Sequence, residues 1–188
     1  MNPPDAGGGT PWGCILSCGT GLMAITAFVF AGIGWMVGTT VMPDEPLAEV
    51  DAFDPGDDHV RLTVSGTAPD PNGYGFVLEL QASDGRVLPM LIGGAEADAI
   101  QRSLNGIPVP RPMTHDLAIL VVEGLEGELI GVAIRKLEDE TFHAALFLER
   151  ADGSLVQVDS RSSDAIALAL RARAPIYAHE DVLDSAGF

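Results

Sequence analysis

The sequence predicts an α+β domain with a mostly antiparallel sheet and about three helices, preceded by a single transmembrane helix. Three observations lead to this prediction. Short runs of alternating apolar residues come in pairs joined by turn residues, which is typical of β-hairpins. Segments with helical spacing separate those pairs, which favours α+β over regular βαβ alternation. One long apolar stretch without charge comes before them, at residues 14–42.

The N-terminal part of the chain is expected to attach the protein to a membrane. Residues 1–13 form a polar tail, and residues 14–42 are long enough to cross a bilayer as one helix. A cleaved signal peptide is the alternative, but residues 1–12 contain no Lys or Arg and no clear Ala-x-Ala site follows the apolar run. We therefore expect a single-pass membrane protein. Its orientation is not encoded, because no Lys or Arg precedes Arg61.

A linker is expected at residues 43–58. It carries seven Asp and Glu residues, three prolines and no basic residue. Like charges and prolines keep a chain extended, so we expect this segment to be an unfolded spacer.

The globular domain, residues 59–188, is predicted to begin with three strands and a helix. The strands are expected at Val60–Ser65, Phe76–Gln81 and Val87–Ile92, with Asp84-Gly85 as the turn of the second hairpin. The helix is expected from Ala95 to Leu104, where Asn105-Gly106 ends it.

Prolines at 108, 110 and 112 then predict an extended passage. Thr114 is expected to cap a second helix, whose Leu117, Leu120 and Val121 would face the core. The remaining elements are strands at 129–135, 142–148 and 155–158, a third helix from Ser162 or Ser163 to about Arg173, a short strand at 176–177 and a helical turn from about 180.

Composition limits the functional classes. The chain has a formal charge of −17, and nine of its ten basic residues are arginines. Within residues 59–188, ten basic residues face nineteen acidic ones, so we expect weak, non-specific and salt-sensitive binding of nucleic acid. Cys14 and Cys18 both lie in the apolar stretch, which excludes a disulfide framework and zinc-thiolate sites in the domain. No phosphate-binding loop, dinucleotide fingerprint or nucleophile elbow occurs.

Two blocks of polar residues stand where loops should turn into helices, namely 110–117 and 159–169. Helix starts favour anions, and carboxylates hold Mg²⁺ or Mn²⁺, so the blocks suggest phosphodiester hydrolysis. His115 is the candidate general base, and Arg111 and Arg161 are the candidate phosphate clamps. The acidic candidates are Asp116 beside His115 and, as metal ligands, Asp159, Asp164 and Glu96.

Each candidate also has a structural interpretation. The acids at helix starts stabilise the helix dipole, and Thr114 and Ser163 are expected to be N-caps. Arg161 is a candidate partner of Asp116 in an internal ion pair. The histidines at 59, 143 and 179 lack motif context and are taken as structural, and Arg171 and Arg173 suit the C-terminal end of the third helix.

These blocks resemble those of the bifunctional nuclease domain family over residues 59–187. The resemblance rests on Pro110-Arg111-Pro112-x-Thr114-His115-Asp116-Leu117 and Ser163-Asp164-Ala165-Ile166-Ala167-Leu168-Ala169. It implies a compact α+β domain, cleavage of DNA and RNA, a role for a divalent metal and a cytoplasmic location. Two residues depart from the family pattern, because Ser162 replaces a usual proline and Met113 a usual leucine.

Two functions remain open from the sequence. One is a membrane-anchored nuclease of low sequence preference that depends on Mg²⁺ or Mn²⁺ and cleaves DNA, RNA or both. The alternative is a non-catalytic module that binds an anion or a partner while tethered to the membrane. Exposed sheet edges also favour a homo-oligomer.

Overall fold

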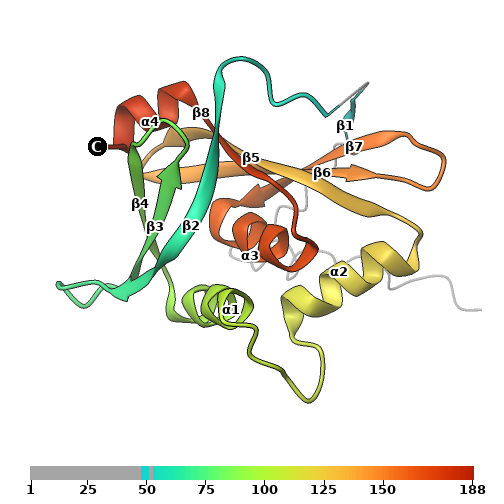
Figure 1. Ribbon diagram of the computed structural model, residues 1–188, viewed down its shortest axis with the longest axis horizontal. Coiled ribbons are helices and arrows are strands. Elements are labelled where there is room, and N and C mark those ends of the chain that lie inside the picture. The colour runs from blue at the N-terminus through green and yellow to red at the C-terminus, as the bar shows by residue number, and fades with distance from the viewer. Residues whose placement is uncertain (1–47, 51–52) are drawn as a thin grey trace, which may run out of the picture. The chain divides into compact units, whose positions relative to one another are not determined.

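A mixed eight-stranded sheet forms the centre of the fold, in the order β1-β7-β6-β5-β8-β2-β3-β4 (Figure 1). The computed structural model describes residues 48–50 and 53–188, and those residues lie within one unit, Glu45–Phe188. The strands are β1 Ala48–Val50, β2 His59–Pro69, β3 Phe76–Ala82, β4 Val87–Ile92, β5 Glu128–Glu138, β6 Thr141–Glu149, β7 Leu155–Arg161 and β8 Ile176–His179.

Neighbouring strands are antiparallel except for β5 and β8, which are parallel. Strand β8 lies between β5 and β2, and it is antiparallel to β2. It therefore joins a group of strands formed by β1, β7, β6 and β5 to a second group formed by β2, β3 and β4.

Four helices complete the described part of the chain: α1 Gly94–Leu104, α2 Thr114–Gly124, α3 Ser162–Ala172 and α4 Glu180–Ala186. Helix α3 packs against α1, α2 and strands β5 to β7 (Figure 1). Buried side chains of α1, α3 and α4 share one core with β2 to β6 and β8, because alternate residues of those strands are apolar. Ile100, Ile134 and Ile166 are fully buried in this core.

The α+β class, the antiparallel character and the order of the elements confirm the sequence prediction. The linker differs from expectation, since residues 48–50 pair with β7 as a strand. No helix among residues 48–50 and 53–188 is long and apolar enough to cross a membrane. The predicted span at 14–42 and the polar tail lie outside the described residues.

The orientation predicted for α2 is wrong. Leu117, Leu120 and Val121 are exposed, and no residue of α2 is fully buried. Its inward face instead carries His115 and Asp116, whose side chains pair with α3, and Ile119, which packs against the core. The covered face of the helix is thus partly polar, with two contacts to α3 beside one apolar contact with the core.

The predicted N-caps are also wrong by one or two residues. Met113 is the N-cap of α2, and its N–H donates to the Asp116 carboxylate at 2.9 Å. Arg161 is the N-cap of α3, so Ser162 and Ser163 lie inside its first turn. The residue with extended backbone angles is Met113 in α2, one before the predicted cap, and Arg161 in α3, two before it.

The face of the sheet away from α3 is covered near its middle by an aromatic cluster. The ring of Phe53 lies 4.8 Å from that of Phe147 and 5.9 Å from that of Tyr177. Gly131 lies directly beneath this ring, where a Cβ would be 2.2 Å from Cζ of Phe53. The absent side chain at 131 thus allows Phe53 to fasten the start of the domain to the sheet.

Candidate functional site

The end of β7 and the start of α3 carry an exposed arginine held by two carboxylates. Arg161 Nε donates to Asp164 Oδ2 at 2.7 Å, and its Nη2 donates to Glu96 Oε1 at 3.0 Å. The Arg161 side chain remains 67% exposed. The hydrogen bond from Arg161 to Asp164 is the main reason why the pKa of Arg161 is raised. Two carboxylates, one three residues along the chain and one from α1, thus fix a guanidinium at the surface.

A histidine joins the same carboxylate from α2. His115 Nε2 lies 3.0 Å from the second oxygen of Asp164, so both oxygens of that carboxylate have partners. Burial acts to raise the pKa of Asp164, but hydrogen bonds from Arg161 and His115 outweigh it, and the pKa lies below its usual value. When Nε2 carries the proton toward Asp164, the lone pair of His115 is on Nδ1. Nδ1 makes no hydrogen bond with a described residue and is accessible to solvent.

A second ion pair lies deeper between the helices. Arg171 Nε donates to Asp116 Oδ1 at 2.5 Å, and its other nitrogens donate to the carbonyls of Ala167 and Ala99. The pKa of Asp116 is lowered, first by the hydrogen bond from the Met113 N–H and then by Arg171. The Arg171 side chain is only 11% exposed. Its hydrogen bonds to Asp116 and Ala99 connect α3 to α2 and α1.

The structure therefore separates the predicted site residues. Glu96, His115, Arg161 and Asp164 form one connected cluster, which we call the Arg161 cluster. Asp116 belongs to the Arg171 pair, so the expected Arg161–Asp116 pair does not form. Arg111 is exposed and makes no ion pair with another described residue.

Asp159 also lies apart from the Arg161 cluster. It lines a different cavity on the sheet, together with His143 and His179. Val158 packs against the core, so strand alternation places Asp159 on the opposite face.

The acidic residues that the sequence suggests as metal ligands do not gather at one point. Within residues 48–50 and 53–188, no three His, Cys, Asp or Glu side chains lie in an arrangement that could hold a metal ion. Asp164 and Glu96 are both engaged with Arg161, and Asp159 is elsewhere. The described residues as arranged do not fit a Mg²⁺ or Mn²⁺ site.

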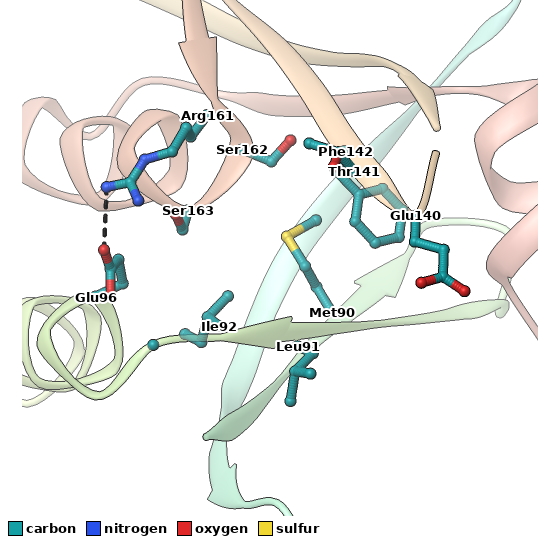
Figure 2. A pocket seen from close by; sticks show the side chains of 11 residues that line it. Met90, Leu91, Ile92, Glu96, Glu140, Thr141, Phe142, Arg161, Ser162 and Ser163 are labelled. Carbon is teal, nitrogen blue, oxygen red and sulfur yellow. Dashed lines mark hydrogen bonds and ion pairs between the residues drawn. The ribbon is translucent and has the colours of Figure 1, made fainter. Parts of the chain in front are cut away.

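An open cavity of about 330 Å³ adjoins the Arg161 cluster (Figure 2). Arg161 and Glu96 stand at one side of it, while Met90, Ile92 and Phe142 supply apolar walls. Ser162 and Ser163 bring the first turn of α3 to the cavity, so N–H groups at the helix start are close to it.

Two features of this cavity were not visible in the sequence motifs. Glu140 reaches it from the two-residue turn between β5 and β6, where Asp139 and Glu140 both have positive φ. The Ser162 side chain is 2% exposed and its hydroxyl has no partner. Arg171 was also missed as the partner of Asp116, although it lies seven residues after Asp164 and so on the same face of α3.

Comparison with known proteins places these observations in a family context. The family model described as the bifunctional nuclease domain matches residues 77–188. An uncharacterized protein of Mycobacterium tuberculosis is 39% identical over 117 residues, which cover 62% of this chain and 69% of the relative. Bifunctional nuclease 1 of Arabidopsis thaliana is 26% identical over 122 residues, and Bifunctional nuclease 2 of Oryza sativa is 25% identical over 123. In both plant proteins the match covers 64% of this chain but only 37% of the relative.

Proposed function

Because this chain belongs to the bifunctional nuclease domain family, we propose that it hydrolyses phosphodiester bonds at the Arg161 cluster. The observation that carries the proposal is an arginine that is both fixed and exposed. Arg161 is oriented by two carboxylates, yet its guanidinium keeps donors toward solvent beside the first turn of α3. Two plant relatives are named bifunctional nucleases, which supports the same reaction class.

Arg161 would bind the phosphate of the substrate. Guanidinium groups bind phosphate oxygens with two parallel hydrogen bonds, and a helix start adds N–H donors and partial positive charge. Both features meet at the cavity of about 330 Å³. Such donors also stabilise the negative charge that grows on the phosphoryl oxygens as a nucleophile attacks.

His115 would move the proton. Imidazole is the most frequent general base in enzymes, and here Asp164 fixes the ring through Nε2. Nδ1 of His115 would accept a proton from the water that attacks phosphorus, while the P–O bond to the leaving ester oxygen breaks and that oxygen takes a proton from solvent. Asp164 orients the imidazole and stabilises the imidazolium that forms, which is a positioning role.

Metal dependence is a separate proposal, which rests on the family resemblance. The roles of Arg161 and His115 do not involve a metal, because the described donors as arranged do not fit one. Mg²⁺ or Mn²⁺ bound together with substrate would neutralise phosphate charge near a protein of strongly negative net charge. A chelator therefore tests a requirement that is independent of Arg161 and His115.

A second candidate function is a non-catalytic module that binds a partner protein. The observation in its favour is the apolar side of α2, where large side chains are exposed: Met113, Leu117, Leu120, Val121 and Leu125. Large contiguous apolar patches on a protein surface mark sites of interaction with other proteins. A homo-oligomer formed through this face is one form of that candidate.

Membrane attachment through residues 14–42 remains our proposal from the sequence, as does a cytoplasmic location for the domain. Extraction of cell membranes at alkaline pH tests the attachment, since an integral span stays in the pellet. Recovery of the protein in the supernatant would contradict it.

The nuclease proposal is tested with the full chain, plasmid DNA and an RNA transcript, each with Mg²⁺, Mn²⁺ or chelator. Arg161→Gln is expected to reduce cleavage by about 10²-fold or more, and His115→Gln by about 10²–10⁴-fold. Arg102→Gln is the control, because Arg102 makes only a surface pair with Asp98. Equal rates in all three variants would identify the activity as a contaminant and refute the proposal. Thermal melts check that each variant is folded.

A further inference from the structure

A second cavity, of about 610 Å³, opens on the face of the sheet away from α3. Val60, Phe142 and Ala178 belong to the core or pack against it, so strand alternation turns their neighbours to the opposite face. Residues of five strands, β2 and β5 to β8, and of the start of α4 line it. The polar ones include His59, Arg135, Lys136, His143, Asp159 and His179.

A β-bulge brings two cations into this cavity. The pairing of β5 with β6 shifts between Ile134 and Lys136, so that Lys136 pairs with His143. In a regular strand, Arg135 and Lys136 would point to opposite faces. Both line the cavity here, because a bulge re-aims the side chain at the extra residue. The irregularity thus concentrates positive charge at one place.

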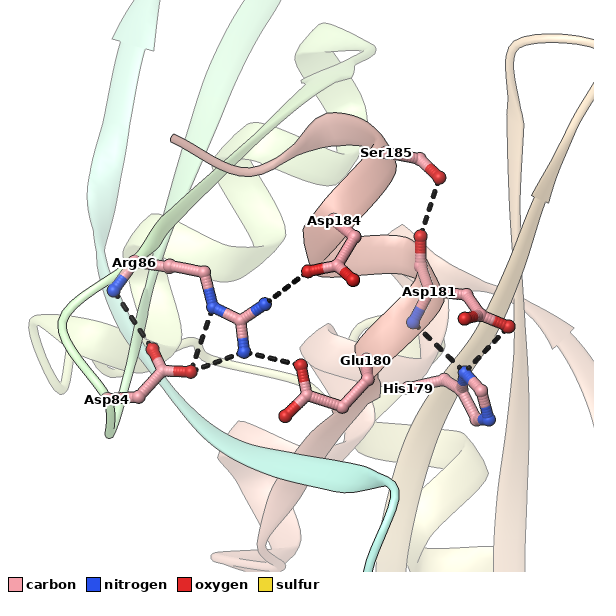
Figure 3. Close-up of polar contacts among 7 residues, drawn as sticks. All are labelled: Asp84, Arg86, His179, Glu180, Asp181, Asp184 and Ser185. Atoms are coloured by element: carbon pink, nitrogen blue, oxygen red, sulfur yellow. Dashed lines mark hydrogen bonds and ion pairs between the residues drawn. The ribbon is translucent and has the colours of Figure 1, made fainter.

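Two histidines stand opposite each other across β2 and β8. His59 and His179 are paired in register, and their rings meet edge to face at 5.0 Å. His59 Nδ1 is buried and has no hydrogen-bond partner among the described residues. His179 Nδ1 accepts the N–H of Asp181 (Figure 3). Neutral His179 therefore carries its proton on Nε2, which has no described partner.

The charges in the cavity are only partly balanced. Lys136 pairs with Glu138, and His179 lies 3.4 Å from a carboxylate oxygen of Asp181. Arg135 makes no ion pair with another described residue. The pKa of His59 is lowered first by burial and then by His179 and Arg135, against the opposing charges of Asp58 and Asp54. Arg135 therefore favours the neutral form of His59, while Asp159 and Asp181 place negative charge at the same cavity.

We propose that this cavity binds a phosphate group. Guanidinium, ammonium and imidazole N–H groups from four strands line it, and such groups donate well to phosphate oxygens. A bound phosphate would pair with the charge of Arg135 and accept hydrogen bonds from the imidazole N–H groups. The volume of about 610 Å³ exceeds that of a single phosphate, so free phosphate, pyrophosphate and a nucleotide share the chemistry required.

This site is distinct from the Arg161 cluster and does not depend on the proposed function. His143 and Arg161 are neighbours in the β6–β7 register, yet the cavity beside Arg161 is walled by the core residues Met90, Ile92 and Phe142. The histidine cavity faces the other side of the sheet. If the protein had no nuclease activity, the proposal of phosphate binding in the histidine cavity would still stand or fall by its own test.

The test is calorimetric titration of the full chain with phosphate, pyrophosphate and adenosine monophosphate. Arg135→Gln and His143→Gln are each expected to weaken binding about tenfold, since each removes one charged or imidazole donor. Arg173→Asn is the matched control, because it removes one positive charge at the exposed end of α3, where positive φ suits asparagine. Binding of phosphate or pyrophosphate supports a free anion as ligand, and binding of only the nucleotide supports a phosphate ester.

Nuclear magnetic resonance locates the bound phosphate. The imidazole C–H resonances of His59 and His179 are expected to shift, and the pKa of His59 is expected to rise, because phosphate adds negative charge near its ring. Four acids lie near this ring or line the cavity: Asp54, Asp58, Asp159 and Asp181. They are present with and without phosphate, so they do not account for a rise in the pKa of His59. Lack of binding by all three ligands overturns the proposal. Equal weakening in the Arg173 control, or shifts confined to residues 162–164, would also overturn it.

Discussion

Replacement of Arg171 by methionine tests the deepest contact of the candidate region. Methionine fills similar space but removes three donated hydrogen bonds, to Asp116, Ala167 and Ala99. Removing one partner of a buried ion pair costs about 3–5 kcal/mol. The Asp116 side chain is 28% exposed and retains the Met113 N–H, so we expect a smaller loss of about 2–3 kcal/mol.

The free energy of unfolding of the full chain is measured by urea titration, with far-ultraviolet circular dichroism as the probe. In a thermal melt, a loss of this size lowers the midpoint by about 4–10 °C in a chain of this length. Arg102→Met is the matched control, because its partner Asp98 is on the surface of the same helix and such pairs contribute about 0.3–0.5 kcal/mol. A double-mutant cycle with Asp116→Asn isolates the pair and should give a coupling of at least about 1 kcal/mol.

The refuting result is equally specific. If Arg171 only complemented the C-terminal dipole of α3, its removal would cost about 0.3–1 kcal/mol. A loss in that range, together with a coupling energy near zero, would show that the contacts with α1 and α2 contribute no stability. The Arg171–Asp116 contact would then not help to hold α2 in its orientation.

Three further predictions follow from particular residues. Ser162→Ala should raise the free energy of unfolding by about 1 kcal/mol in urea titration, because it removes a buried hydroxyl without a partner; a loss would mean that the hydroxyl has one. Glu140→Gly should raise it by about 1 kcal/mol in the same assay, because glycine adopts positive φ without strain; no gain would contradict the turn geometry. The pKa values of Asp116 and Asp164 are both lowered, so their contribution is complete above about pH 5 and is lost as pH falls through about 3.9 and below. Urea midpoints measured against pH should therefore fall less steeply for Asp164→Asn than for the unmodified chain, and parallel profiles would disprove the linkage.

The order and type of the elements were predictable because their signals are local. Alternation in Phe76–Gln81 and the Asp84-Gly85 turn identify a hairpin without knowledge of the rest of the chain. The same holds for the helix that begins at Ser162, since the apolar residues that follow have helical spacing. The parallel pairing of β5 with β8 has no such signal, because the two strands are separated by β6, β7 and α3.

The candidate site was predicted in part, for physical reasons that individual residues illustrate. The link between His115 and Asp164 requires α2 to turn its leucines outward, which contradicts the apolar pattern of that helix. The sequence could have shown that Asp159 does not share a site with Asp164. Val156 and Val158 face the core, so the next residue, Asp159, points to the other face of the sheet. The pairing of His59 with His179 depends on the register of two strands far apart in the sequence, which no motif encodes.

The central place of β8 has a consequence for how the protein is made. Until residues 176–179 have left the ribosome, β2 and β5 each present an unpaired edge. The nascent chain therefore carries two half-sheets that are open to pairing with neighbouring chains, and only the closing strand unites them. Synthesis that stalls before Ile176 should yield a product that aggregates or is degraded, even though most of the fold has already been translated.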